Sequence, residues 1–194
     1  MNVTVIDLGL GNLGSVMQAL KRAGADPHLS ADPAEVAKAE RVILPGVAAF
    51  GVGIQRAANF KPAVQEVLAR HAPVLGICLG MQILFEEGEE DGVRPGLGLL
   101  PGRVTKLPPS VQVPHIGWQK LRATGESPLG PRGWAYFAHS YRCEAPDEVT
   151  QAWVDHGPVR IAAVVGRGSL YGVQYHPEKS AGDGEALLKS FLRL

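Results

Sequence analysis

Cys78 lies between two glycines, in the segment Gly76-Ile77-Cys78-Leu79-Gly80. A nucleophile flanked by glycines in this way is typical of a tight turn from a strand into a helix, where a Cβ on either side would collide with neighbouring chain. The turn places the side chain at a helix N-terminus, where the dipole and free N–H groups favour a thiolate over a thiol. The segment therefore predicts a reactive thiol. Alternatively, a free cysteine can simply be a small residue buried in the core.

A thiol nucleophile needs a base, and His176 is the best placed of the six histidines. It ends a strand-like run, and Pro177 and Glu178 follow it. A histidine and a carboxylate two positions apart at a strand end can lie on one side, so that the carboxylate holds the far ring nitrogen and fixes the tautomer. We therefore predict a triad of Cys78, His176 and Glu178. A histidine that only caps the sheet is the alternative role for His176.

The order of these residues along the chain separates two classes of enzyme. In α/β-hydrolases the order is nucleophile, acid, histidine, whereas this chain reads Cys78, His176, Glu178. This order disfavours a hydrolase similar to dienelactone hydrolase.

A second glycine motif, Gly9-Leu10-Gly11-Asn12-Leu13-Gly14, follows the first strand-like run. It matches the G-x-G-x-x-G pattern of dinucleotide-binding folds, and Asp32 and Glu35 lie roughly 20 residues further on. However, no clear second strand ends in an acidic residue, and glycines permit a tight strand-to-helix turn in any doubly wound protein. We therefore interpret this motif as a turn rather than a nucleotide site.

Alternating strand-like and helical patterns position these motifs in the first half of the chain. The strand-like runs cover residues 3–8, 27–30, 41–44 and 74–77, and the helical patterns cover 14–22, a segment opening at 32–33, 62–70 and 79–86. This order of β-α units predicts an α/β fold with a doubly wound, mostly parallel sheet and helices on both faces.

Glycine and proline become frequent after residue 88. Short strand-like runs follow at 102–107, 116–121, 135–142, 151–154, 159–165 and 169–175, and an amphipathic helical pattern covers 184–192. We expect this β-rich second half to extend the same sheet, so that residues 1–194 form a single domain.

Composition limits the possible functions. The chain has 194 residues with 45% hydrophobic content, enough for one core. Its 19 basic and 19 acidic residues cancel, which argues against nucleic acid or an acidic membrane as a partner. We see neither a signal peptide nor an apolar run of ~20 residues, so we expect a cytoplasmic location. Two cysteines are too few for a disulfide scaffold, although one bridge between Cys78 and Cys143 stays open.

The two segments that carry the triad resemble a known family. "GICLGMQILF" (residues 76–85) and "YGVQYHPEKS" (171–180) are similar to the class I (triad) glutamine amidotransferases, and the resemblance runs from the first strand to Lys179 and the helix beyond. "VPHIGWQKL" (113–121) and "YFAHSYR" (136–142) narrow it to the glutaminase subunits of imidazole glycerol phosphate synthase, an enzyme of histidine biosynthesis. Guanylate and anthranilate synthase glutaminases carry different sequences around the Pro-His-x-Gly-Trp run.

The resemblance implies a role for each triad residue. Cys78 would attack the side-chain carboxamide of glutamine and form a γ-glutamyl thioester. His176 would pass a proton to the departing ammonia and then activate water for deacylation, while Glu178 would orient His176. No cofactor and no metal ion is expected.

The resemblance also implies the residues around the triad. The oxyanion would be held by backbone N–H groups of Leu79 and of Val47, with Gly46 and Ala48 nearby. The family commonly has glycine where this chain has Ala48. The substrate glutamine would be bound by Gln82, Glu90 and the main chain at Ser140 and Tyr141. Alternatively, the acidic run that contains Glu90 can be an ordinary solvated helix end.

A separate partner is also implied, because ammonia released into water is protonated and loses its nucleophilicity. We expect a heterodimer with a cyclase (synthase) subunit, bound through a face that carries Asn12, His115, Trp118 and Lys179. Three alternatives stay open: the glutaminase of another synthase, such as that of pyridoxal phosphate synthesis; a noncatalytic interaction subunit of the same fold; and a cysteine-elbow protein of the peptidase or chaperone type.

Overall fold

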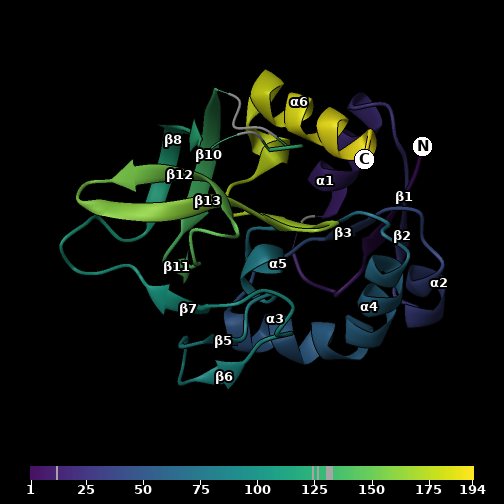
Figure 1. The fold of residues 1–194 in the computed structure, drawn as a ribbon, viewed down its shortest axis with the longest axis horizontal. Helices are drawn as coiled ribbons and strands as arrows, with labels where there is room; N and C mark the ends of the chain where they lie inside the picture. The colour runs from purple at the N-terminus through teal and green to yellow at the C-terminus, as the bar shows by residue number, and fades with distance from the viewer. Residues whose placement is uncertain (12, 124, 126, 130–132) are drawn as a thin grey trace.

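The computed structural model describes residues 1–11, 13–123, 125, 127–129 and 133–194 (Figure 1). Its helices are α1 (Leu13–Arg22), α2 (Pro33–Ala37), α3 (Phe50–Ala57), α4 (Lys61–Ala69), α5 (Leu79–Gln82) and α6 (Ala181–Leu192), with 3-10 turns at Ala58–Phe60 and Pro177–Lys179. Asn12, which belongs to the predicted glycine motif and partner face, lies outside the described residues. Within the described part of the chain, no helix is long and apolar enough to cross a membrane.

The strands fall into one large and two small sheets. The first half contributes β1 (Asn2–Ile6), β2 (Asp26–Ser30), β3 (Val42–Leu44), β4 (Val74–Ile77), β5 (Glu87–Gly88) and β6 (Arg94–Pro95). The second half contributes β7 (Arg103–Lys106), β8 (His115–Lys120), β9 (Arg122–Ala123), β10 (Trp134–His139), β11 (Tyr141–Glu144), β12 (Thr150–His156), β13 (Val159–Arg167) and β14 (Leu170–Val173).

The main sheet has eight strands in the order β2-β1-β3-β4-β14-β13-β12-β9. The neighbours from β2 to β14 pair in parallel, and those from β14 to β9 pair antiparallel. The prediction of a mostly parallel α/β sheet with a β-rich second half is confirmed. β14 is the last strand in the sequence, yet it lies in the middle of the sheet beside β4.

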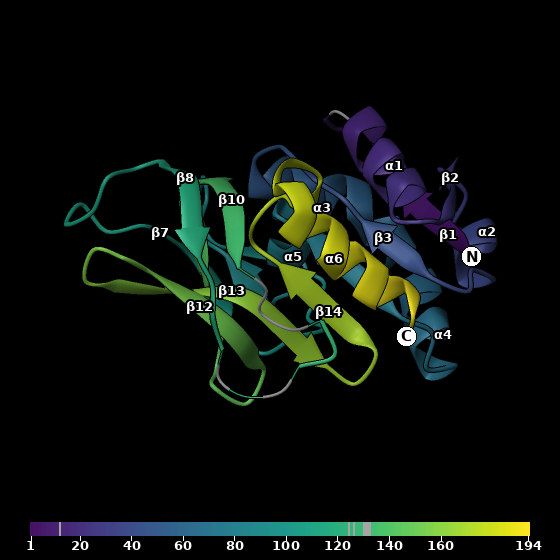
Figure 2. The same ribbon diagram turned by 90° about the horizontal axis from the view of Figure 1, so that it is seen from above.

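Helices cover both faces of this sheet, as Figures 1 and 2 show. Side chains of successive strand residues point to opposite faces, so each strand contributes to two cores. Val5 and Leu75 pack with α1 and α6 in one core, while Leu44 and Val74 pack with α2, α3 and α4 in the other. The parallel strands are buried on both faces, which explains their nearly continuous apolar sequences.

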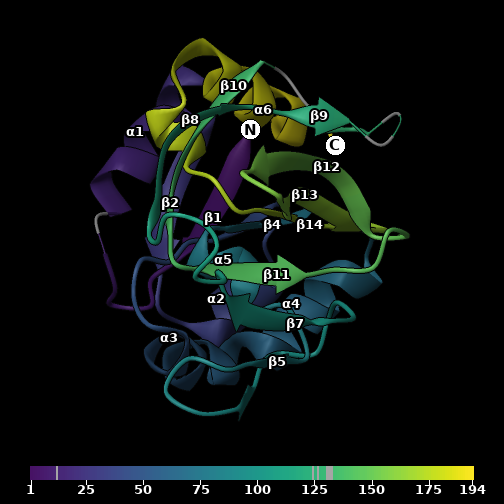
Figure 3. The same ribbon diagram turned by 90° about the vertical axis from the view of Figure 1, so that its left-hand side faces the viewer.

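The two small sheets, β10-β8 and β11-β7-β5-β6, lie at one end of the main sheet (Figure 3). The predicted strand at 135–142 is in fact split at Ser140 into β10 and β11, which join different sheets. The predicted helix at 79–86 ends at Gln82, because the carbonyls of residues 83–85 accept hydrogen bonds from the N–H groups of 97–100 instead. Helix α3 was not predicted, since Gly51 and Gly53 weaken its helical pattern.

Candidate active site

Cys78 lies at the junction of β4 and α5, in the predicted strand-to-helix turn. Its φ of +53° and ψ of −109° are unusual for a residue other than glycine, and its N–H donates to the Val173 carbonyl oxygen at 2.8 Å. A Cβ at Gly80 would lie 1.8 Å from the Leu44 carbonyl oxygen, and a Cβ at Gly76 would lie 2.6 Å from that of Gly80. Glycine is therefore required on both sides of the cysteine.

Cys78 and Cys143 are both free thiols, so the bridge that the sequence left open is absent. Cys143 lies on β11 and is buried in the core, and burial raises the pKa of its thiol well above the usual value. A thiol of this kind stays protonated and unreactive.

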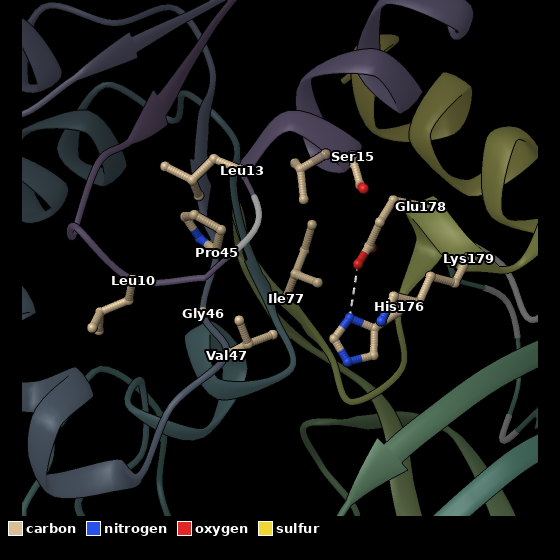
Figure 4. A pocket seen from close by; sticks show the side chains of 11 residues that line it. Leu10, Leu13, Ser15, Pro45, Gly46, Val47, Ile77, His176, Glu178 and Lys179 are labelled. Carbon is tan, nitrogen blue, oxygen red and sulfur yellow. Dashed lines mark hydrogen bonds and ion pairs between the residues drawn. The ribbon is translucent and has the colours of Figure 1, made fainter.

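His176 and Glu178 form a buried pair beside the cysteine. His176 Nδ1 lies 2.8 Å from Glu178 Oε1, and both side chains are more than nine-tenths buried (Figure 4). The His176 backbone is also fixed, since its N–H donates to the Tyr136 carbonyl and its own carbonyl accepts from the Ser180 hydroxyl. The far nitrogen, Nε2, is left for the thiol.

The charge state of His176 follows from these neighbours. Burial lowers the pKa of the imidazole, but hydrogen bonding and charge from Cys78, and then from Glu178, outweigh it and raise the pKa to about 9. The ring is therefore protonated at neutral pH. The structure thus brings the three predicted triad residues together as a cysteine against an imidazolium held by a carboxylate.

One cavity contains Cys78 and the residues predicted to bind substrate. It is lined by Val47, Ala48, Leu79, Gln82, Glu90, Ser140 and Tyr141. Five further residues that were not predicted also line it: Ala49, Pro114, Ile116, Ala138 and His139. These come from loops and strand ends, whose contribution to a cavity depends on tertiary packing and leaves no local pattern.

Glu90 is the one member of the acidic run that faces this cavity. Its Oε2 accepts a 2.6 Å hydrogen bond from the Phe50 N–H, at the start of α3. Glu86 and Glu89 bond instead to the backbone N–H groups of Gly102 and Lys106. The structure therefore separates Glu90 from its acidic neighbours.

Val47 lies between this cavity and a second one. The second cavity is lined by Leu10, Leu13, Ser15, Val16, Pro45, Gly46, Val47, Ile77, His176, Glu178 and Lys179 (Figure 4). Gly11 lies against Val47, since a Cβ at position 11 would meet Val47 Cγ2 at 2.0 Å, and the φ of Gly11 is +74°. The described glycines after β1 thus serve a turn and a close approach, as the turn interpretation requires.

The predicted partner face is only partly at the surface. Trp118 is 47% exposed and Lys179 is exposed, but His115 is only 2% exposed. The surface position predicted for His115 is wrong, because its ring stacks between Phe137 and His156 at centroid distances of 4.9 and 4.2 Å. Ile116, the next residue of β8, is 60% exposed instead.

His115 belongs to a buried pair that the sequence did not indicate. His139 Nδ1 lies 2.8 Å from the Tyr141 carbonyl oxygen and must donate to it, so His139 Nε2 accepts from His115 Nδ1 at 3.0 Å. Burial lowers the pKa of His115 to about 4, with a smaller effect from His156. Burial also lowers the pKa of His139 to about 3. Both rings are therefore neutral at physiological pH.

These lowered pKa values predict a loss of stability in acid. Below about pH 6.5 the unfolded chain binds protons that folded His115 and His139 do not, which lowers the free energy of unfolding by up to about 2 kcal/mol for each ring at about pH 5. His176 acts in the opposite sense: its raised pKa gives stability that is fully present below 6.5 and is lost as pH rises through 9. It cannot cause the loss in acid.

Denaturant unfolding at about pH 7.5 and pH 5, in the wild type and in His139→Asn, measures this contribution. Asparagine keeps a donor for the Tyr141 carbonyl but does not titrate. We expect the wild type to lose about 2 kcal/mol more than the variant between the two pH values. Equal losses in the two proteins would contradict the assignment of the acid sensitivity to this pair.

Comparison with known proteins is consistent with this geometry. Residues 4–194 match the family model described as "Glutamine amidotransferase class-I". The chain is 45% identical to "Imidazole glycerol phosphate synthase subunit HisH" of Symbiobacterium thermophilum, covering 99% of this chain and 93% of the relative, and 42% identical to the protein of the same name from Lactococcus lactis, covering 98% and 97%.

Two solved structures share the fold at low sequence identity. One is PurLQS from Thermotoga maritima, with a TM-score of 0.76 and 21% identity over 99% of this chain and 97% of that one. The other is the glutaminase domain of Trypanosoma brucei CTPS with bound acivicin, with a TM-score of 0.72 and 15% identity over 99% and 92%.

Proposed function

This chain belongs to the class-I glutamine amidotransferases, and on that basis we propose that it is the glutaminase subunit of an imidazole glycerol phosphate synthase. It hydrolyses glutamine to glutamate and ammonia. The observation that carries the chemistry is the hydrogen bond between Cys78 and the buried imidazole of His176, which Glu178 holds from the other side. Cys78 lines the cavity that contains the predicted substrate-binding residues.

The first half of the reaction makes a thioester. The Cys78 thiolate attacks the carboxamide carbon of glutamine, and the oxygen that becomes negative is held by backbone N–H groups of Leu79 and of the turn at Val47. His176, which is protonated beforehand, gives its Nε2 proton to the nitrogen as the C–N bond breaks. Ammonia and a γ-glutamyl thioester result, and the imidazole is left neutral.

The second half regenerates the thiolate. Neutral His176 takes a proton from water, whose oxygen attacks the thioester carbon, and glutamate leaves as the C–S bond breaks. Glu178 accepts from Nδ1, which lies 2.8 Å from its Oε1, so that Nε2 is the nitrogen that gives up and takes the transferred proton. Glu90 suits the α-ammonium group of glutamine, because it is the carboxylate that lines the cavity.

We assign the route of ammonia to the second cavity (Figure 4). His176 lines this cavity, whose other walls are largely apolar, and Val47 separates it from the thiol. Val47, which lines both cavities, is 47% exposed, and Ile116, which lines the cavity of the thiol, is 60% exposed. Trp118, two positions further along β8, is 47% exposed. Exposed large apolar residues of this kind fit a partner subunit, and we propose that the cyclase covers them together with Lys179.

The test is glutamate release by the purified chain alone, with the cyclase, and with the cyclase and its nucleotide ligand. We expect weak hydrolysis alone and strong stimulation by the cyclase with ligand, because the partner covers the exposed apolar residues around the site. A pyridoxal phosphate synthase subunit serves as the matched control and should not stimulate. Strong turnover by the isolated chain that no cyclase alters would contradict the proposed partner.

A further inference from the structure

Gln174 is a fully buried polar residue that the proposed reaction leaves without a role. It follows β14 directly, two positions before His176, and its exposed fraction is 0%. An amide in such a place costs free energy unless its donors and its acceptor are paired. Its partners therefore indicate why the chain has an amide here.

The parallel pairing of β14 with β4 places Gln174 beside the nucleophile. Gly172 is opposite Gly76 and Val173 is opposite Ile77 in this ladder. The next residues in register are Gln174 and Cys78, and the Gln174 side-chain nitrogen lies 3.8 Å from Cys78 Sγ. The contact thus comes from the two residues that directly follow two central strands of the sheet.

The surrounding hydrogen bonds determine which end of the amide faces the sulfur. Gln82 Nε2 donates to the Tyr141 carbonyl oxygen at 3.0 Å and to Gln174 Oε1 at 3.2 Å. A carbonyl can only accept, so the Gln82 amide must present its NH₂ group to Tyr141 and to Gln174. Gln174 then has its oxygen towards Gln82 and its NH₂ group towards Cys78.

We propose that Gln174 is a positioning residue of the thiol, whose side-chain NH₂ group donates to Cys78 Sγ while its carbonyl oxygen fixes the Gln82 amide. A donor aimed at sulfur favours the thiolate over the thiol. It differs from His176, because it is neutral at every pH and cannot take up the proton. The role in glutamine hydrolysis rests on the proposed function, whereas the effect on the thiol does not.

Alkylation of Cys78 by iodoacetamide as a function of pH tests this proposal. Peptide mass spectrometry separates Cys78 from Cys143, and the reaction needs neither glutamine nor a cyclase. Gln174→Met keeps the side-chain length but removes the donor and the acceptor. We expect its alkylation profile to shift to higher pH by about one unit, with about a tenfold lower rate near neutral pH. Its cyclase-stimulated kcat should fall by a similar factor.

Two further variants keep the test decisive. Gln174→Glu preserves the shape and the acceptor for Gln82 but presents an oxygen to the sulfur, and it should shift the profile at least as far. Gln151→Met removes an amide from β12, where the side-chain oxygen accepts from the Ser127 hydroxyl, and should leave the profile unchanged. A folded Gln174→Met or Gln174→Glu protein with the wild-type profile overturns the proposal, even if glutaminase activity is absent throughout.

Discussion

Cys78→Ala is expected to abolish cyclase-stimulated glutamine hydrolysis, with a decrease on the order of 10⁴-fold or more. Alanine cannot form the thioester, so water would have to attack the carboxamide directly. The φ of +53° at this position is compatible with alanine only at the strain that cysteine already bears. The variant should therefore fold as the wild type does and still bind glutamine.

The double variant Cys78→Ala/His176→Ala provides the control for this expectation. Residues that act as one unit give losses that do not add, so the double variant should be no slower than Cys78→Ala alone. The measurement is glutamate release under saturating cyclase and ligand. Turnover of Cys78→Ala within about tenfold of the wild type would exclude the thioester route.

Gly80→Ala is expected to lower the free energy of unfolding by about 3 kcal/mol or more and to abolish activity. The new Cβ would lie 1.8 Å from the Leu44 carbonyl oxygen, and that atom is backbone in the centre of the sheet. Relief requires α5 to move away from β3, which takes Cys78 out of line with His176. Denaturant unfolding and Cys78 alkylation measure the two effects.

Gly182→Ala is the matched control, because nothing lies within 4 Å of its Cβ position. It lies in α6, and alanine has a higher helix propensity than glycine, so the change should be neutral or stabilising by up to about 1 kcal/mol. If Gly80→Ala behaved like this control, the close packing of α5 against β3 would be wrong.

The fold and the grouping of Cys78, His176 and Glu178 could be predicted because their signals are local. The glycines around Cys78 form a motif of five residues, and the pair of His176 and Glu178 lies within three positions. The parallel strands carry their apolar residues in continuous runs. Each of these features can be recognised in a short stretch of sequence, although the contact that requires Gly80 is with the distant Leu44 carbonyl oxygen.

The features that were predicted wrongly, or not at all, depend on contacts between distant parts of the chain. His115 was predicted on the surface because its place in a sequence motif does not reveal that the Phe137 and His156 rings enclose it. The role of Gln174 was not predicted, because its partners Cys78 and Gln82 lie far earlier in the sequence. The break at Ser140 arises because the residues before it pair with β8 and the residues after it pair with β7, in a different sheet.

The position of β14 in the sheet has a consequence for protein synthesis. Gln174 and Cys78 are separated by 96 positions along the chain, and the strand that joins them inserts between β4 and β13, both of which leave the ribosome earlier. A nascent chain that ends before β14 therefore has a sulfur with no base and a gap in its sheet. Copies that end before this point cannot consume cellular glutamine, and hydrolysis begins only once β14 and His176 have been synthesised.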